Sequence, residues 1–589
     1  MAKRVILVMR YHVIEPLGVL YLLGVAKRAG WDAQVILIKE SDFTPLFDLA
    51  KSFKPDLVGF SIWTGWHVQT FKACDEVRAM GFPVAIGGPH ATFNADACLP
   101  HADYVVKGEG FRLFRELLEG KLAPGIHFDE ERMAEGFPIP DRELLYNLYP
   151  ELGTSSIKSI MCSVGCPFKC SYCYAPHYNN MYGGFELTLR PVDEVVEEGI
   201  WIRENFPCEL IYFQDDIFGF NLTWLAEFAE KWPTRVGIPW HCQIRLEMTR
   251  DERRLDLFKA GGCTGITLAI ESGNDFLREF VLFRGMTDDL IEEGIRKIQD
   301  RGLTLRTEQI LAVPFSDIQT DIETLKFNVK LKPSMAWTSI LQPYGGTNMG
   351  TIASKFGFWR GTNDDLDESF FDRSTLQHVK GGRHSIESVA RALKNGKESS
   401  LLGMKVDLPA AGDGNARVFS KDFVGIGGNP PDPACEISYL SPEENTRYCD
   451  QTAILQRNFD WLSKVPDGHE LATRFVALPK EEWTWSTLGK FGEEHFVEKC
   501  GFDNVQMFKA QLTEAVGGPT LPARILENPF PFFVLPSGPD FARYLVEKNV
   551  LETADQKELF DAFGREVRYW LYGRALYRTE VAEPAILAL

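Results

Sequence analysis

The chain has 589 residues, 45% of them hydrophobic and 25% charged, and this length corresponds to about three or four domains of ordinary size. With 63 basic and 82 acidic residues, its formal net charge is −19. This charge argues against a general nucleic-acid-binding protein, because such proteins neutralise phosphates with basic side chains. The sequence has no run of about 18 uncharged apolar residues and no small-residue cleavage site after its first apolar run, so we expect neither a membrane span nor a signal peptide.

Cysteine usage indicates the cellular compartment. Four of the 12 cysteines lie within residues 162–173, too close together for a pairwise disulfide framework. Without an export signal, this pattern indicates metal binding in a reducing cytosol. We therefore expect a cytoplasmic protein.

The first 120 residues alternate between strand and helix patterns. The strand-like segments cover residues 4–9, 32–38, 56–62, 83–88 and 102–108. Helical patterns at 17–29 and 68–80 lie between them. Strands about 25 residues apart with helices between them predict βαβ units and a parallel sheet. Ligands of such sheets bind beyond the carboxyl ends of the strands.

Three of these strand ends carry unusual residues. They read SIWTGWH at 61–67, GGPHAT at 87–92 and GEG at 108–110. Glycine pairs let the backbone approach a large ligand closely, although tight turns explain them equally well. No G-x-G-x-x-G follows the first strand, so a dinucleotide is disfavoured.

The order of these pieces, after a first helix that opens with PLG, resembles the cobalamin-binding domain in front of many radical SAM enzymes. The resemblance covers about residues 4–120 and implies a set of cobalamin-binding residues. These are Ser61, Trp63, Thr64, Trp66, His67, Gly87, Gly88, Pro89, His90, Gly108, Glu109 and Gly110.

One departure from that family concerns the lower face of cobalt. The D-x-H-x-x-G signature, which supplies a histidine to cobalt in methionine-synthase-like domains, is absent. The resemblance therefore implies base-off cobalamin without a protein histidine on cobalt. It also implies that Trp63, Trp66 and His67 shield the lower face, with His67 as the candidate for a direct ligand. The alternative is a helix-capping loop with aromatic anchors.

The segment CSVGCPFKCSYC at 162–173 is the strongest signal in the chain. Cys166, Cys170 and Cys173 have the spacing C-x3-C-x2-C, and three thiolates on one tight loop can bind three irons of a [4Fe–4S] cluster. Tetrahedral zinc is the alternative, since four cysteines would fill a closed site, but no second C-x2-C pair follows at zinc-ribbon spacing. We expect Cys162 to be a strand residue, because a fourth ligand would close the open iron.

This spacing, with the aromatic Tyr172 before the last cysteine, is similar to the signature of the radical SAM superfamily. The resemblance implies that the open iron binds the methionine part of SAM, and that the reduced cluster cleaves SAM to a 5′-deoxyadenosyl radical. The implied SAM-binding residues are Tyr172, Asp215, Asp216, Arg190, Arg245, Glu271 and Val313.

Their roles follow from their positions in that family. Asp215 and Asp216 fall where the methionine amino group is held, Glu271 where the ribose is held, and Val313 where adenine packs. Arg190 and Arg245 are candidates for a carboxylate contact. The chain has AVPF at 312–315 where many relatives have G-x-P-G. Ordinary ion pairs at a barrel rim are the alternative for each charged residue.

The part of the chain after the first domain predicts a barrel. Its expected strands cover residues 157–162, 210–213, 240–246, 265–270, 305–313 and 337–341. Six strands with intervening helices such as 192–205 match the partial (βα)6 barrel of radical SAM enzymes, whose polar residues gather at strand C-termini.

The C-terminal third lacks this rhythm. Loops are expected at 409–415 and 425–433, helices at 443–465, in parts of 490–515 and at 540–577, and an aromatic loop at 528–533. The expected architecture is therefore α/β, in four parts. These are a Rossmann-like, parallel-sheet cobalamin-binding domain at 1–125, a linker at 126–155, a partial TIM-like radical SAM barrel at 156–350, and a mainly helical, substrate-covering domain at 351–589.

Together the resemblances imply a cobalamin-dependent radical SAM methyltransferase. The deoxyadenosyl radical would take hydrogen from a carbon of a small-molecule or natural-product substrate, which would then receive the methyl group of methylcobalamin. A flavodoxin or ferredoxin would supply electrons. The alternative is a B12-dependent radical SAM cyclase or oxidative rearrangement enzyme without methyl transfer. A cobalamin sensor or carrier with a degenerate barrel is a third interpretation, which the intact cysteine motif opposes.

Overall fold

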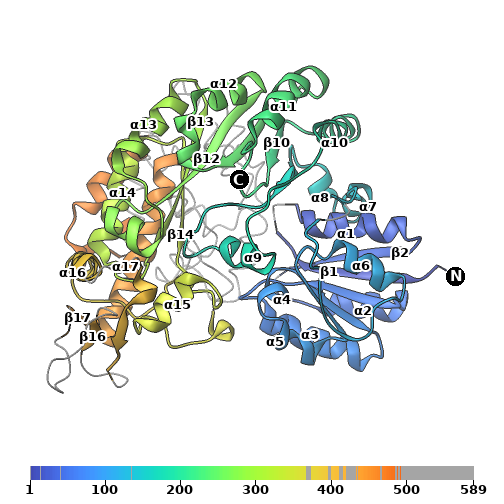
Figure 1. The fold of residues 1–589 in the computed structure, drawn as a ribbon, viewed down its shortest axis with the longest axis horizontal. Helices are drawn as coiled ribbons and strands as arrows, with labels where there is room; N and C mark the ends of the chain where they lie inside the picture. The colour runs from blue at the N-terminus through green and yellow to red at the C-terminus, as the bar shows by residue number, and fades with distance from the viewer. Residues whose placement is uncertain are drawn as a thin grey trace, which may run out of the picture.

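The structure is a computed structural model (Figure 1). It describes residues 2–12, 15–39, 41–133, 136–366, 373–395, 400–409, 415–419, 433, 435–464, 467–484, 487–488 and 491. The helix expected at 540–577 and the aromatic loop expected at 528–533 lie outside these residues, as does the helix expected at 490–515 apart from Phe491. Within the described part of the chain, no helix has both the length and the apolar composition to cross a membrane.

The N-terminal domain is built on a parallel sheet of six strands in the order β2-β1-β3-β4-β5-β6. The strands are β1 (Arg4–Arg10), β2 (Asp32–Ile38), β3 (Leu57–Ser61), β4 (Val84–Gly87), β5 (Tyr104–Lys107) and β6 (Gly125–Phe128). The strand order reverses between β1 and β3, the point at which doubly wound sheets bind ligands. The predicted parallel sheet is confirmed, and β6 extends it into the region expected to be a linker.

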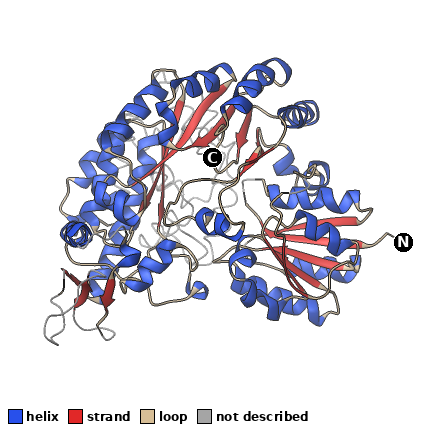
Figure 2. Cartoon of the chain, viewed as in Figure 1, coloured by secondary structure: helices blue, strands red, loops and turns tan. Residues whose placement is uncertain are grey.

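Helices cover both faces of this sheet (Figure 2), which explains why its strands read as continuous apolar runs. One face packs against α1 (Leu17–Arg28) and α6 (Phe111–Leu118), and the other against α2 (Thr44–Phe53) and α3 (His67–Ala79). After β6, α7 (Arg142–Leu148) packs on the α1 side.

The second sheet is the predicted partial barrel, and all its strand pairs are parallel. Its order β14-β13-β12-β11-β10-β7 leaves the barrel open between the last strand and the first. The strands are β7 (Ile157–Ile160), β10 (Leu210–Phe213), β11 (Trp240–Ile244), β12 (Cys263–Glu271), β13 (Thr304–Leu311) and β14 (Met335–Ile340).

Helices lie on the outer side of this sheet and leave its inner side facing the N-terminal domain (Figures 1 and 2). They are α10 (Val192–Asn205), α11 (Leu222–Arg235), α12 (Glu252–Ala260), α13 (Asp288–Gln299) and α14 (Ile318–Leu331). Strand β13 shows the resulting alternation, since Leu305 and Thr307 are buried under the helices while Arg306 and Glu308 on the inner face are half-buried. Among the described residues, this two-residue period is that of a strand with one face packed against helices and one face less buried.

The described C-terminal region contains α15 (Asn348–Lys355), α16 (Gly382–Asn395), α17 (Pro442–Lys464), α18 (Gly468–Val476) and a small antiparallel sheet, β15 (Lys405–Asp407), β16 (Asn415–Phe419) and β17 (Cys435–Ser438). Helix α17 packs on β14, where Gln456 Nε2 donates to the Thr338 carbonyl at 2.8 Å. It occupies the position of a sixth barrel helix, so the barrel layer uses chain well beyond residue 350.

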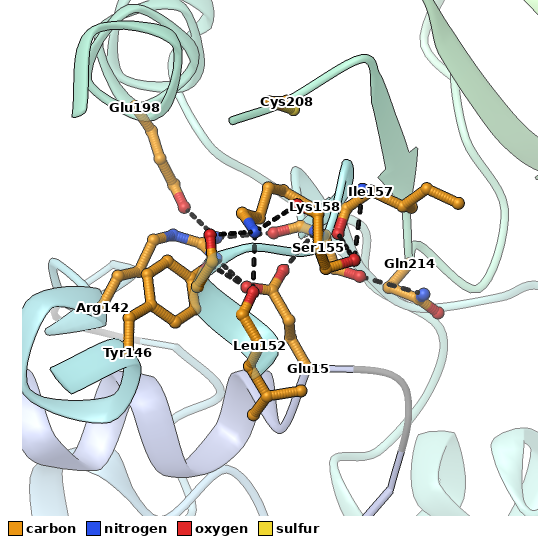
Figure 3. Close-up of polar contacts among 12 residues, drawn as sticks. Glu15, Arg142, Tyr146, Leu152, Ser155, Ile157, Lys158, Glu198, Cys208 and Gln214 are labelled. Carbon is orange, nitrogen blue, oxygen red and sulfur yellow. Dashed lines mark hydrogen bonds and ion pairs between the residues drawn. The ribbon is translucent and has the colours of Figure 1, made fainter. Parts of the chain in front are cut away.

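A buried cluster of charges joins the two domains (Figure 3). Glu15 precedes α1, and its Oε1 lies 3.1 Å from Nη1 of Arg142 on α7. Arg142 Nη2 lies 2.6 Å from Oε1 of Glu198 on α10, the first long barrel helix. Tyr146 donates its hydroxyl proton to Glu15, and the Ser159 amide of β7 also donates to Glu15. Segments far apart in the sequence therefore meet in one buried network, which we call the domain joint.

The rest of the domain joint holds the strand that leads into the cysteine segment. Arg190 Nη1 lies 2.6 Å from Glu198 and donates to the Met161 carbonyl at 3.1 Å. Lys158 donates to the carbonyls of Leu152, Gly153 and Ser155 at 2.6–3.0 Å. Burial alone would raise the pKa of Glu198, but Arg190 and Arg142 hold this pKa below its ordinary value. Glu198 is thus a charged, paired carboxylate at neutral pH.

Candidate functional site

The N-terminal sheet has a cavity of about 250 Å³ where its strand order reverses. The cavity lies between the sheet and the helices α1 and α6. Predicted cobalamin residues that line it are Ser61, Gly87, Gly88, Pro89, Gly108, Glu109 and Gly110. Most of the remaining wall is apolar and comes from Leu7, Val19, Phe60, Val106, Phe114 and neighbouring residues. An apolar slot bordered by polar strand ends suits a large ligand with an aromatic part.

Glycine is required at the rim of this cavity. Gly88 has φ +92°, and a Cβ there would lie 2.8 Å from the backbone nitrogen and oxygen of Ile62. Gly108 and Gly110 also have positive φ, at +83° and +72°. These conformations favour glycine because L side chains are strained in them. The glycines therefore bring the backbone itself to the edge of the cavity.

The other predicted cobalamin residues, Trp63, Thr64, Trp66, His67 and His90, do not line this cavity. Trp66 is fully buried, with Trp63 and Phe43 against it at centroid distances of 5.9 and 5.7 Å. The tryptophans thus anchor the turn between β3 and α3, which supports the capping-loop alternative for these two side chains.

Both ring nitrogens of His67 have partners. Nδ1 accepts from the Gly65 amide at 3.1 Å, and Nε2 lies 3.0 Å from Asp364 Oδ1 in the C-terminal region. The neighbouring His90 stacks on this ring at 4.0 Å and pairs through Nδ1 with Thr64 Oγ1 at 2.9 Å. Desolvation lowers the pKa of His90 to about 3, so His90 is neutral. Neither nitrogen of His67 is left for a metal in this arrangement.

The segment 162–173, which we call the cysteine loop, follows the end of β7. Cys162 was expected to be a strand residue, but it lies between β7 and the next short strand, in neither of them. It is buried in the barrel core and its amide donates to Asp215, whereas Cys166 and Cys173 are half-buried. Gly165 has φ +119°, and a Cβ there would lie 2.4 Å from the Glu186 carbonyl. A short antiparallel pair, β8 (Ser163–Val164) with β9 (Thr188–Leu189), closes the loop from one side.

Several hydrogen bonds hold the loop in shape. Ser171 donates from Oγ to the Val281 carbonyl at 2.6 Å, and the amide of Met349 donates to the Ser171 carbonyl at 2.7 Å. Asn179 Nδ2, on α9 (Ala175–Met181), donates to the Cys166 carbonyl at 2.8 Å. The loop is thus preorganised by the barrel, by α9 and by α15.

The two adjacent aspartates after β10 have different surroundings. Asp215 is buried and accepts from Ser163 Oγ at 2.5 Å and from the Cys162 amide at 3.2 Å. Burial raises the pKa of Asp215 to about 7. Asp216 is exposed and accepts from the Gly165 amide at 3.2 Å. Asp215 therefore braces the cysteine loop, and Asp216 is the carboxylate that remains accessible to a ligand.

Cationic side chains surround Cys170, the middle cysteine. Arg245 follows β11 and donates from Nη1 to Cys170 Sγ at 3.0 Å. Arg284 Nη1 lies 3.7 Å from the same sulfur. Arg245 also stacks over the ring of Phe168 at 4.3 Å. Arg245 was predicted for SAM, and here its guanidinium is turned toward the cysteine loop.

Glu271 ends β12 in a left-handed conformation with φ +70°. Its Oε1 accepts from the Tyr172 hydroxyl at 2.5 Å and from Arg284 Nη1 at 3.4 Å. Burial raises the pKa of Glu271, although Arg284 opposes this effect. Backbone strain at a buried carboxylate is typical of functional sites. The structure therefore groups Tyr172, Glu271, Arg284 and Cys170.

Two predicted SAM residues have other environments. The Arg190 guanidinium belongs to the domain joint, where Glu198 and the Met161 carbonyl take its Nη1, and this favours a structural role over a SAM contact. Val313 is buried in the core next to the C-terminal region. It lies in the AVPF loop, whose Ala312 and Phe315 both have positive φ, at 55° and 69°.

These two positions are those at which many relatives have glycine in G-x-P-G. A left-handed conformation costs an ordinary residue roughly 1–2 kcal/mol, so the loop needs support from its surroundings. Asp321 on α14 accepts from the Ala312 amide at 3.4 Å and from the Tyr448 hydroxyl at 2.8 Å. Ser316 pairs with the same hydroxyl at 2.9 Å. Helix α17 thus stabilises the loop through Tyr448.

Asp321 makes stability depend on pH. Burial raises its pKa from the ordinary 3.8 to about 7, so the folded protein binds this proton more tightly than the unfolded chain. Raising the pH through this range therefore disfavours the folded state. The Asp321→Asn variant lacks this effect, and its free energy of unfolding relative to the parent is expected to increase by about 2 kcal/mol from pH 5 to pH 8. Urea unfolding at both pH values tests this, and an unchanged difference would contradict it.

The carboxyl end of the N-terminal sheet faces the cysteine loop. Tyr178 of α9 donates to Glu109, which lines the cavity. Phe93 stacks on Tyr174, directly after the loop, at 4.2 Å. Met161 lines the cavity and lies one residue before Cys162. The cavity and the cysteine loop are therefore neighbours across the domain boundary.

Several of these residues were missed from the sequence. Gly59, within β3, and Gly18, in α1, line the cavity, and a glycine inside a buried strand is a usable signal of close approach. Arg284 and Met161 have no local motif, because only the tertiary fold brings them to the site. Among the described residues, no three His, Cys, Asp or Glu side chains are grouped to hold a single metal ion. Three ligands to different irons of one cluster need not converge on a single point.

Comparisons with known proteins agree with this architecture. Residues 3–118 match the family model of the B12 binding domain, and residues 160–327 match that of the Radical SAM superfamily. The bacteriochlorophyllide d C-8(2)-methyltransferase of Chlorobaculum tepidum is 31% identical over 311 residues, which cover 50% of this chain and 67% of that protein. An uncharacterized methyltransferase of Pyrococcus horikoshii is 27% identical over 57% of this chain and 78% of that protein. Of other curated relatives, the chain spans as little as 48%.

A solved structure is similar over almost the whole chain. It is the cobalamin-dependent S-adenosylmethionine radical enzyme OxsB with aqua-cobalamin and S-adenosylmethionine bound. The TM-score is 0.51 at 12% identity, with 98% of this chain and 84% of that chain covered, and this likeness shows the fold. The two matched models and the relative at 31% identity lead to one conclusion: the chain belongs to the cobalamin-dependent radical SAM enzymes, which combine a B12-binding domain with a radical SAM domain.

Proposed function

We propose that this chain is a methyltransferase that moves a methyl group from cobalamin to a carbon of a small molecule. The observation that carries the proposal is that the N-terminal cavity and the cysteine loop are adjacent. Met161 lines this cavity and immediately precedes the cysteine loop. When bound, the cluster with SAM supplies hydrogen abstraction and methylcobalamin supplies the methyl group. Adjacent sites allow both to act on one substrate held between them.

The residues that would hold the cluster and SAM follow from the donor set. Cys166, Cys170 and Cys173 would bind three irons. Asp216 would accept from the amino group of SAM, since its carboxylate is exposed beside the cysteine loop. Glu271 would accept from the ribose hydroxyls, oriented by Tyr172 and Arg284. Each of these groups binds or orients, and none has to transfer a proton.

Cobalamin would bind base-off, with its detached base in the apolar cavity and no histidine on cobalt. The cavity's apolar wall and glycine rim fit an aromatic base. The partners of His67 support the absence of a histidine ligand, because Gly65 and Asp364 engage both ring nitrogens.

We also propose a cytoplasmic location and an external low-potential donor such as flavodoxin or ferredoxin. The described cysteines are all free, including the buried Cys74, Cys98, Cys242 and Cys263. Unpaired cysteines in this number are typical of a reducing compartment. The cluster needs one electron for each SAM cleaved, and the chain itself provides no further motif for an electron-carrying group.

Labelled methyl transfer tests the proposal. The full chain is purified without oxygen, reconstituted with iron, sulfide and hydroxocobalamin, reduced, and incubated with methyl-labelled SAM and candidate carbon substrates. We expect about four irons and one cobalamin per chain, label on cobalamin, and label in the product. Tetrapyrroles are the first substrates to try, since the relative at 31% identity is named for one. Cobalamin binding and SAM cleavage with an altered but unlabelled product would instead favour the cyclase or rearrangement alternative.

A further inference from the structure

Two buried guanidinium groups converge on the sulfur of Cys170. Arg245 Nη1 donates to Cys170 Sγ at 3.0 Å, and Arg284 Nη1 lies 3.7 Å from it. Arg245 is 8% exposed and Arg284 is 2% exposed. The two come from different segments, one after β11 and one in the loop before α13. Burying two cations is costly unless each has a partner that needs it.

Each guanidinium is held by a carboxylate of its own. Glu247 binds Arg245 at two points, with Oε1 2.7 Å from Nη2 and Oε2 3.1 Å from Nε. Arg284 contacts Glu271 at 3.4 Å and donates to the Tyr172 hydroxyl at 2.8 Å. Because Glu247 binds the Arg245 guanidinium at Nε and Nη2, only Nη1 can point toward the Cys170 sulfur. The direction of the charge is therefore fixed before any ligand binds.

We propose that Arg245 and Arg284 are positioning residues that set the reduction potential of the iron–sulfur group bound by Cys170. The inference rests on the proposed function, because it requires a cluster on the cysteine loop. Reduction adds one electron, supplied by an external low-potential flavin or iron–sulfur protein, and makes the thiolate-bound group more negative by one charge. Cations and N–H donors at a ligand sulfur stabilise that state and raise the potential.

This role differs from the SAM contact predicted for Arg245. A contact to the SAM carboxylate would change the affinity for SAM and leave the potential of the SAM-free protein unchanged. A hydrogen-bond donor to Cys170 would instead change the reduction potential of the SAM-free protein, because it acts on the cluster whether or not SAM is present. Glu247 adds a test of sign, since removing its negative charge leaves Arg245 less neutralised beside the sulfur.

The variants are Arg245→Met, Arg245→Lys and Glu247→Gln in the full chain, with Arg296→Met as control. Arg296 on α13 is 64% exposed and pairs with Asp300, the residue after the helix, so this control removes one exposed positive charge. After reconstitution, the reduced fraction is followed by electron paramagnetic resonance during a redox titration without SAM. Iron content and SAM affinity are measured on the same samples.

We expect Arg245→Met to lower the reduced-to-oxidised ratio at a fixed potential about tenfold, which is 59 mV for one electron. Arg245→Lys should lower this ratio less than Arg245→Met does. Glu247→Gln should raise the ratio, and Arg296→Met should leave it unchanged. If Arg245→Met fails to retain iron, Arg245→Lys and Glu247→Gln carry the test.

Three results would overturn the inference. If the Arg245→Met and Glu247→Gln proteins keep the parental iron content and show the parental reduction potential, the inference is refuted and the proposed function stands. A change in SAM affinity alone would assign Arg245 to SAM. A parent protein that binds no cluster would refute the proposed function together with the inference. Arg284→Lys, which keeps the charge but loses the fork, extends the same titration to the second arginine.

Discussion

A Cys170→Ala protein is expected to lose its iron–sulfur cluster and its cleavage of SAM, while it still binds about one cobalamin per chain. Cys170 supplies one of three thiolates on the loop, and no other cysteine of the loop can replace it without moving the loop away from its anchors at Val281 and Met349. The cavity of the N-terminal domain contains no atom of Cys170 in its wall. Metal analysis and the optical spectrum of bound cobalamin measure both effects in one sample.

Cys162→Ala is the matched control. Cys162 lies four residues before Cys166, but it is 1% exposed in the barrel core and its carbonyl accepts from the Arg190 amide. Its replacement removes one buried sulfur at a cost of about 1 kcal/mol, and iron should be retained. A full cluster in Cys170→Ala, or iron loss in Cys162→Ala, would show that the ligands have been assigned to the wrong cysteines.

The converse result is expected when the N-terminal cavity is filled. Gly18 lines the cavity, and a Cβ at this position meets no other atom within 4 Å. A leucine at this site is therefore compatible with the fold, and it also improves the helix propensity of α1 by roughly 0.5–1 kcal/mol. Gly18→Leu is expected to weaken cobalamin binding about a hundredfold, or ~2.7 kcal/mol, with iron content unchanged.

Gly18→Ala separates cavity filling from the helix effect. It gives nearly the same gain in helix propensity but fills little of the cavity, so its cobalamin affinity should stay close to that of the parent. Titration of the iron-free proteins with hydroxocobalamin measures both affinities. Parental affinity in Gly18→Leu would mean that cobalamin does not enter this cavity.

The elements that could be predicted are those with a strong local pattern. Strands β2 and β10 and helix α10 have the predicted bounds, and the other predicted strands of the two sheets differ by one to a few residues at their ends. The cysteine motif is local too, because a loop that wraps one cluster needs its ligands close in sequence. Strand β6 was missed because its four residues are all half-buried and carry no alternation.

The parts of the site that could not be predicted depend on long-range contacts. Arg284 reaches Cys170 across 114 positions of sequence, and Tyr448 reaches Asp321 across 127. Arg190 was expected, from its position in the family, to contact a carboxylate of the ligand. In the structure its guanidinium instead pairs with Glu198 in the domain joint. A charged residue at a strand end indicates burial or function, and only the fold decides between them.

The domain joint has a consequence for modularity. Arg142 stands between Glu15 of one domain and Glu198 of the other, and both carboxylates are buried with it (Figure 3). A chimaera carrying the N-terminal domain of a relative without a matching acid would leave this guanidinium half-paired in the interior, at a cost of about 3–5 kcal/mol. The two halves are therefore not interchangeable parts, and grafting one onto a foreign partner requires transplanting the acid, the arginine and the strand end together.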